Sequence, residues 1–341
     1  MSFPNREPAG AIMALVGTLL VIRSVIPASA GEDRPAKKLD YRIERSIVIK
    51  GFDGQTCWVH TRPGAIPVGA PGNAGKQPIV VITLQKLMLT RSDVFYGIHD
   101  LRTDNLGAEW VGPREHNTLK RRHLKPGIDV VPCDFWPQWH AASGKLLGTG
   151  KTFYYTTNNQ RHLDRAPSEM AYSSYDPGAN RWKPWKTLAL PDEPKFKNAS
   201  AGCAQRYDLA SGEILLPIYY RRRDQKEHRV TICRCRFDGA TLRFIEHGDE
   251  LELPPAEKHG DGFSEPSLTK FGNRFYLTLR TVQHGYVATS DDGLHFGSMK
   301  RWTFDDGTDL GSYNTQQHWV THSDRLFLIY TRRGLKNDHV F

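Results

Sequence analysis

The sequence predicts an all-β protein built from repeated four-stranded sheets. Short runs rich in Val, Ile, Tyr, Phe and Thr alternate with clusters of Gly, Pro, Asn and Asp, which is the pattern of strands joined by turns. Amphipathic helices with capping residues are lacking. Two repeated sequence features, an apolar strand preceded by a turn and a second type of turn, divide the chain into units.

The first repeat is a turn followed by an apolar strand, and it occurs at 75–85, 142–155, 210–221, 270–280 and 321–333. The residues that mark these copies are Lys76, Lys145, Glu213, Arg274 and Arg325. They are 69, 68, 61 and 51 residues apart. That spacing suits one four-stranded sheet with its loops in each unit.

The second repeat is a polar turn, seen most clearly in "TSDDGLHF", where Thr289, Asp291, Gly293 and Phe296 have spacings of 0, 2, 4 and 7. It recurs as "TDNLGAEW" at 103–110, as "SYDPGANRW" at 174–182 and in degenerate form as "RFDGATLRF" at 236–244. We expect the aspartate to accept backbone N–H groups, the glycine to adopt a positive φ, and the aromatic ring to pack under the hairpin.

This hairpin resembles the Asp box of sialidases and related β-propellers. The resemblance implies a sialidase-like β-propeller of the six-bladed type, with the Asp box on the outer edge of each blade and away from the active site. It therefore indicates a fold and not a chemistry. The alternative is a set of coincidental turns in a β-sandwich.

The end of the chain departs from the six-bladed pattern. Only five strand repeats are present, and "RGLKNDHVF" reads as the start of a strand that nothing closes. We therefore expect the last blade or blades to be missing. The alternative is that residues 41–60 complete a smaller ring.

The first 30 residues read as a secretory signal. Arg6 precedes an apolar run from Ala9 to Ile22, and Ala28-Ser29-Ala30 forms a cleavage site. The run of 14 residues is shorter than the ~20 that span a bilayer, which disfavours the alternative of an uncleaved anchor. We therefore expect a signal peptide at 1–30, a propeller domain at 31–341, no membrane span after cleavage, and a secreted or periplasmic location.

The formal charge of +9 favours an anionic partner. The basic runs at 120–122 and 221–223 are short, and no nucleic-acid motif accompanies them. We expect an anionic glycan or polysaccharide as the partner, no nucleic acid, and a monomer. Five cysteines are too few for a disulfide scaffold, and the Cys233 and Cys235 pair lacks further ligands at zinc spacing. No metal or cofactor is expected.

Four residues correspond to the catalytic machinery that the resemblance implies. "FSEPSLTKFGNRFYLTLR" is similar to the sialidase stretch with the catalytic base and a carboxylate-clamping arginine, which fall on Glu265 and Arg280. The acid falls on Asp93, ten residues before the first polar turn, and another clamp arginine on Arg62 in "HTRPGAIP". Guanidinium groups suit the clamp because they bind a carboxylate through two parallel hydrogen bonds. The implied function is that of an exo-acting glycoside hydrolase of sialidase type on sialic- or uronic-acid glycans.

Other side chains suggest contacts with a sugar. Trp136 could stack on a sugar face, and His140, in the same segment, could act as acid or base. Gln317 and His318 occupy the corresponding place in the last repeat and could bind hydroxyl groups. Two alternatives follow: a lyase or glycosidase on uronic-acid polymers that uses His140, and a non-catalytic glycan-binding propeller.

Overall fold

The computed structural model describes residues 44–90, 93–156, 158–159, 168–222, 224–257, 260–322 and 324–332. The predicted signal peptide lies outside these ranges. Within them, every regular element is a strand or a short 3-10 helix, so the all-β prediction is confirmed. No helix in this part of the chain is long and apolar enough to cross a membrane.

Sheet one and sheet two follow one another along the chain. Sheet one has the order β1-β2-β3-β4, with β1 (Thr56–Ile66), β2 (Ile79–Met88), β3 (Phe95–Thr103) and β4 (Val111–Glu115). Sheet two has the order β10-β8-β7-β6-β5, with β9 beside β8. Its strands are β5 (Arg122–Lys125), β6 (Ile128–His140), β7 (Lys145–Thr156), β8 (Met170–Asp176), β9 (Arg181–Trp182) and β10 (Lys186–Thr187).

Two further sheets and a hairpin complete the described chain. Sheet three contains β11 (Ala199–Ser200), β12 (Tyr207–Asp208), β13 (Glu213–Tyr220), β14 (Arg229–Phe237) and β15 (Leu242–His247). Sheet four contains β16 (Ser264–Phe271), β17 (Arg274–Arg280), β18 (Gly285–Ser290) and β19 (Lys300–Arg301). The hairpin consists of β20 (Gln317–His322) and β21 (Arg325–Tyr330). The 3-10 helices are η1 (Asn117–Leu119), η2 (Ala141–Ser143), η3 (Pro194–Asn198) and η4 (Pro255–Glu257).

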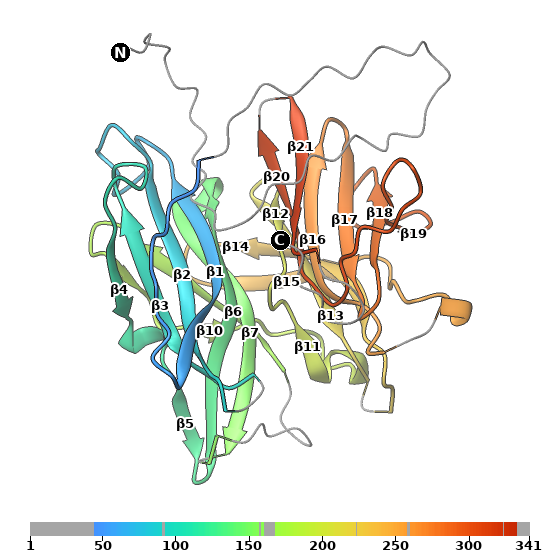
Figure 1. Cartoon of the computed structure of the whole chain (residues 1–341), viewed down its shortest axis with the longest axis horizontal. Helices are drawn as coiled ribbons and strands as arrows, with labels where there is room; N and C mark the ends of the chain where they lie inside the picture. The colour runs from blue at the N-terminus through green and yellow to red at the C-terminus, as the bar shows by residue number, and fades with distance from the viewer. Residues whose placement is uncertain are drawn as a thin grey trace.

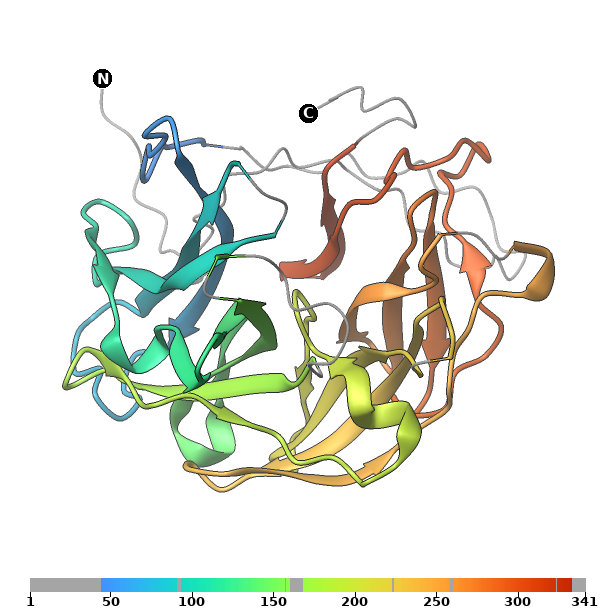
Figure 2. The same cartoon turned by 90° about the horizontal axis from the view of Figure 1, so that it is seen from below.

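The sheets stand around a common axis in chain order (Figures 1 and 2). Neighbouring sheets meet near this axis, because β1 contacts β6, β11 contacts β7, β13 contacts β16, and β16 contacts β20. The chain is thus β-propeller-like, with four sheets and a two-stranded fifth unit among the described residues. The predicted six-bladed type is not confirmed. Of residues 41–60, the part from Thr56 belongs to β1 of sheet one, and the alternative of a smaller ring completed by this segment stays a prediction.

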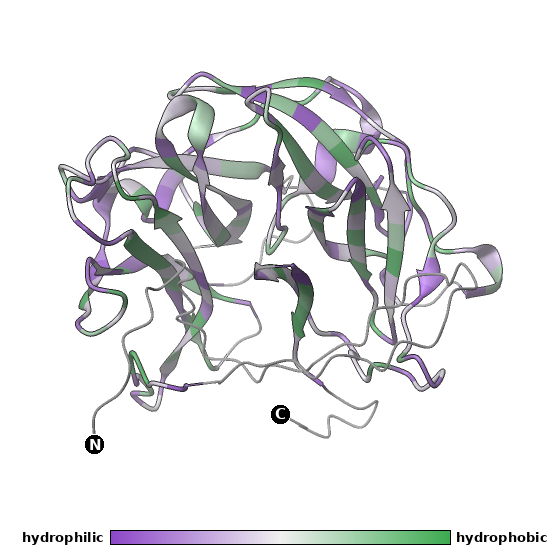
Figure 3. Cartoon of the chain, turned by 90° about the horizontal axis from the view of Figure 1, so that it is seen from above, coloured by the Kyte–Doolittle hydropathy of each residue, from purple (hydrophilic) through white to green (hydrophobic). Residues whose placement is uncertain are grey.

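Neighbouring sheets are held together by apolar side chains that fill the space between their faces. Leu147 of sheet two and Ile214 of sheet three share one buried cluster. Leu215 of sheet three packs with Leu277 of sheet four, and Tyr276 packs against Trp319 of the hairpin. Figure 3 shows apolar positions along the strands of all these sheets. This burial is the main stabilising force between sheets that share few backbone hydrogen bonds.

The two sequence repeats occupy equivalent places in the fold. The apolar strand repeats are β2, β7, β13, β17 and β21, which are inner strands of the four sheets and the second strand of the hairpin. The polar turns lie between β3 and β4, β8 and β9, β14 and β15, and β18 and β19. In the 289–296 turn, however, the capping pair is Ser290 and Asp292, one residue later than the sequence pattern suggested. Asp292 Oδ1 accepts the N–H groups of Leu294 and His295 at 2.8 Å each, whereas the Asp291 side chain is 89% exposed.

Three strands at the centre of the molecule, β1, β6 and β16, each contain a β-bulge. The pairing register breaks in β1, β6 and β16, and each break holds a residue with positive φ: His60 at 56°, Asp134 at 53° and Glu265 at 48°. Cys203, at 54°, lies between β11 and β12, two short strands that both pair with β13. Positive φ is unfavourable for such residues, and bulges of this kind redirect side chains near functional sites.

Candidate functional site

A cavity of about 2040 Å³ opens where β1, β6, β16 and β20 converge. Residues from all four sheets and from the hairpin line it. Its charged lining residues are six cations, Arg45, Arg62, Lys151, Arg221, Arg280 and Arg332, and four acids, Asp93, Asp134, Asp261 and Glu265. This excess of positive charge favours an anionic ligand.

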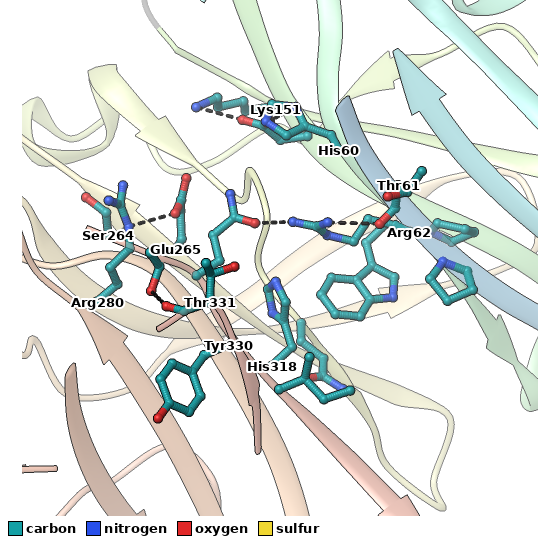
Figure 4. Close-up of a pocket in the computed structure, with 18 of the residues that line it drawn as sticks. His60, Thr61, Arg62, Lys151, Ser264, Glu265, Arg280, His318, Tyr330 and Thr331 are labelled. Carbon is teal, nitrogen blue, oxygen red and sulfur yellow. Dashed lines mark hydrogen bonds and ion pairs between the residues drawn. The ribbon is translucent and has the colours of Figure 1, made fainter. Parts of the chain in front are cut away.

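Glu265 and Arg280 form an ion pair at one side of the cavity (Figure 4). Arg280 Nε lies 2.7 Å from Glu265 Oε2, and the side chains are 18% and 12% exposed. The bulge in β16 places Glu265 beside the end of β17, because Ser264 pairs with Arg280 across the two strands. The guanidinium group of Arg280 also donates to Asn314 Oδ1.

Arg62 approaches the cavity from β1, on the side opposite the Glu265 pair (Figure 4). Its guanidinium group donates to Gln316 Oε1 and, at 2.9 Å, to the carbonyl oxygen of Thr61. It also lies over the indole ring of Trp136, 5.4 Å from the ring centroid. These contacts fix the guanidinium group and hold Trp136 against it.

A second charged cluster lines the cavity around Asp134, a buried carboxylate of β6. Asp134 is ion-paired with His60, Nδ1 to Oδ1 at 2.6 Å, and with Lys151, Nζ to Oδ2 at 2.8 Å. Burial opposes ionisation, but the neighbouring charges of His60 and Lys151 outweigh it and hold the pKa of Asp134 well below its usual value. Lys151 also donates to Tyr219 Oη at 3.2 Å. Burial raises the pKa of Tyr219 to about 12, so its phenol is neutral near pH 7.

The only group of metal-ligating side chains among the described residues is His60, Asp134 and Cys203, whose ligand atoms lie within 4.8 Å of one another. Burial raises the pKa of the Cys203 thiol well above its usual value, and the thiolate is the form that binds a metal. The ammonium of Lys151 already contacts Asp134 where a cation would bind. The arrangement therefore fits an internal ion-pair network better than a metal centre.

His318 presents a neutral ring to the cavity. Its Nδ1 is 2.9 Å from Ser267 Oγ, and its ring meets Trp136 edge-on at a centroid distance of 4.6 Å. Burial, with a further contribution from the charge of Arg62, lowers the pKa of His318 well below its usual value. A neutral imidazole beside an indole can offer one hydrogen bond to a sugar hydroxyl next to a stacking surface.

The structure brings together most of the residues that the sequence suggested. The cavity is lined by Arg62, Asp93, Trp136, Glu265, Arg280 and His318. Gln317 is fully buried and does not line it. His140 is 1% exposed at the end of β6, and its nitrogens face Ser143 Oγ at 2.7 Å and the Gly212 carbonyl oxygen at 2.9 Å. Neither of these two side chains lines the cavity, so the structure gives no support to a contact between them and a sugar.

Sequence reasoning did not find the network of His60, Asp134, Lys151 and Tyr219. Asp134 directly precedes the Phe135-Trp136 pair, and Lys151 belongs to "GTGKT", which is part of β7 and not a phosphate-binding loop. The available signal was an aspartate and a lysine within two segments rich in apolar residues, where charged side chains are uncommon.

No protein-family model and no curated protein matches the sequence. Solved structures do resemble the fold. A protein of unknown function from Dyadobacter fermentans aligns at 16% identity over 80% of this chain and 75% of its own, with a TM-score of 0.50. The alpha-L-arabinofuranosidase from Lactobacillus brevis aligns at 13% identity over 83% and 86%, with a TM-score of 0.51. The structure titled "NanB plus Optactamide" aligns at 11% identity over 84% of this chain and 58% of its own, with a TM-score of 0.52. These likenesses show the fold.

Proposed function

We propose that the protein is a glycoside hydrolase of sialidase type that removes terminal sialic- or uronic-acid residues from anionic glycans in its central cavity. The observation that carries this proposal is Glu265, a carboxylate paired with Arg280 at 2.7 Å inside a cavity with more cations than acids. An arabinofuranosidase shares the fold, so a ring of this kind can hold a glycosidase site.

The proposed roles follow from the chemistry of glycoside cleavage. A proton must reach the leaving oxygen, and a carboxylate must activate the attacking group. We assign the first role to Asp93, which lines the cavity from the loop between β2 and β3, and the second to Glu265. Arg62 and Arg280 face this region from opposite sides and supply positive charge for the substrate carboxylate (Figure 4).

The test is the release of 4-methylumbelliferone from a sialoside, a glucuronide and an arabinofuranoside. Turnover of either acidic substrate supports the proposal, and it should fall in Asp93→Asn while Asp224→Asn stays near wild type. Asp224 is a suitable control because it is 68% exposed, pairs with Arg222 and does not line the cavity. Turnover of the arabinofuranoside alone would refute the anionic substrate. Tight binding of acidic glycans with no turnover would instead support a glycan-binding propeller.

A further inference from the structure

The two arginines that face the proposed substrate carboxylate are already bound to protein groups. Arg280 contacts Glu265 and Asn314, and Arg62 contacts Gln316 and the carbonyl oxygen of Thr61. Each guanidinium group keeps further N–H donors, but Glu265 already offsets the charge of Arg280. A further cation in the cavity would therefore strengthen the recognition of an anion.

Lys151 meets this requirement. Its side chain is 14% exposed and lines the cavity next to His60 (Figure 4). An ammonium group has three N–H donors, and Asp134 Oδ2 at 2.8 Å and Tyr219 Oη at 3.2 Å take two of them. One donor is left for a ligand. Burial acts against its charge, but Asp134 dominates and raises the pKa of Lys151 well above its usual value, so the ammonium stays charged.

The buried Lys151–Asp134 pair depends on unfavourable local features of the fold. A Cβ atom at Gly202 would lie 2.5 Å from Lys151 Cδ and 3.0 Å from Asp134 Oδ2, so the absence of a side chain there lets the pair fit. Asp134 itself sits at a bulge with a φ of 53°. Burying two charges is unfavourable compared with apolar packing, so stability alone does not account for the pair.

We infer that Lys151 binds the carboxylate of the ligand directly, beside the positive charge that Arg62 and Arg280 supply, and thereby determines specificity for acidic sugars. Asp134 and Tyr219 are positioning residues that hold the ammonium in place. This inference rests on the proposed function for the class of ligand, an acidic sugar, but not for its cleavage.

The experiment is isothermal titration calorimetry of the full chain with N-acetylneuraminic acid, with glucuronic acid and with the methyl ester of each. Wild type should bind at least one acid on the order of 10- to 100-fold more tightly than its ester, because a charge-assisted hydrogen bond is lost in the ester. Lys151→Met should abolish this preference. Lys186→Met is the matched control, since Lys186 is exposed, contacts the Ala240 carbonyl oxygen and lies outside the cavity.

Lys151→Met leaves the buried Asp134 with His60 as its only remaining ion-pair partner in the described structure and could unfold, so the double variant Lys151→Met/Asp134→Met is measured as well. It removes both charges and should fold while losing the preference for the acid. Equal binding of acid and ester by wild type, an unchanged preference in a folded Lys151 variant, or no binding of either acid would each overturn the inference. Lys151-dependent binding without turnover of any glycoside would uphold it while refuting the proposed hydrolase.

Discussion

Lys151 Nζ lies 2.8 Å from Asp134 Oδ2, and the two side chains are 14% and 3% exposed. They come from neighbouring strands, β7 and β6, and meet because a bulge turns Asp134 toward the cavity. A buried pair of this kind is strongly destabilised by loss of one partner, since the other charge is then left without compensation.

We therefore expect Asp134→Asn to lower the free energy of unfolding by about 3–5 kcal/mol, because the Lys151 ammonium loses its counter-charge. Urea unfolding followed by tryptophan fluorescence measures this change. Asp224→Asn, at an exposed ion pair, should cost no more than about 1 kcal/mol. Equal stability of the two variants would show that the Asp134 pair does not form.

A second prediction concerns Gly202, whose position leaves no room for a side chain. Gly202→Ala places a methyl group against Lys151 Cδ, so we expect about 1–3 kcal/mol of destabilisation and weaker binding of the acidic sugar. Gly178→Ala is a control, since a Cβ there meets only Asp176 Oδ1, at 3.6 Å. Unchanged ligand affinity in Gly202→Ala would contradict the proposed place of Lys151.

The polar turns allow a test between adjacent aspartates. Asp292→Ala removes the acceptor of two backbone N–H groups and should cost about 1 kcal/mol of stability. Asp291→Ala changes an 89% exposed side chain and should stay within about 0.5 kcal/mol of wild type. Thermal unfolding of the two variants measures the difference. A larger loss of stability in Asp291→Ala than in Asp292→Ala would show that Asp291 is the capping residue, as the sequence pattern suggested.

Acid should destabilise the protein through two partly buried histidines whose pKa is lowered in the fold. The pKa of His318 is well below its usual value, and burial lowers that of His228 to about 4. In the unfolded chain these histidines bind a proton near pH 6.5, whereas in the folded protein they stay neutral to lower pH. The free energy of unfolding therefore keeps its full value above that pH and decreases as the pH falls toward the folded pKa. Each histidine contributes up to about 1.4 kcal/mol per pH unit in that range.

The measurement is urea unfolding of wild type and His318→Gln at pH 7, 6 and 5. The free energy of unfolding should fall with pH in both proteins, and less steeply in the variant because one proton-binding group is gone. Parallel pH profiles would show that His318 is protonated equally in the folded and unfolded chains.

The repeat and part of the site could be predicted from the sequence because their signals are local. The polar turns and the apolar strand repeats recur along the chain. Glu265 and Arg280 belong to one pair of adjacent strands. Asp134 and His60, in contrast, come from different sheets and meet only through the ring and two bulges, which leave no local pattern. His140 ends β6, a strand of 13 residues, and contacts Ser143 and Gly212 outside the cavity that Trp136 of the same strand lines.

The most direct test of the account compares kcat/KM for the preferred acidic glycoside in Glu265→Gln and Glu213→Gln. Glu213 is a matched control, since it pairs with Arg236 on β14 outside the cavity. We predict a loss on the order of 100-fold or more for Glu265→Gln, because the group that activates the attacking nucleophile is gone, and wild-type activity for Glu213→Gln. Retention of full activity by a folded Glu265→Gln enzyme would contradict the assignment of this cavity as the catalytic site.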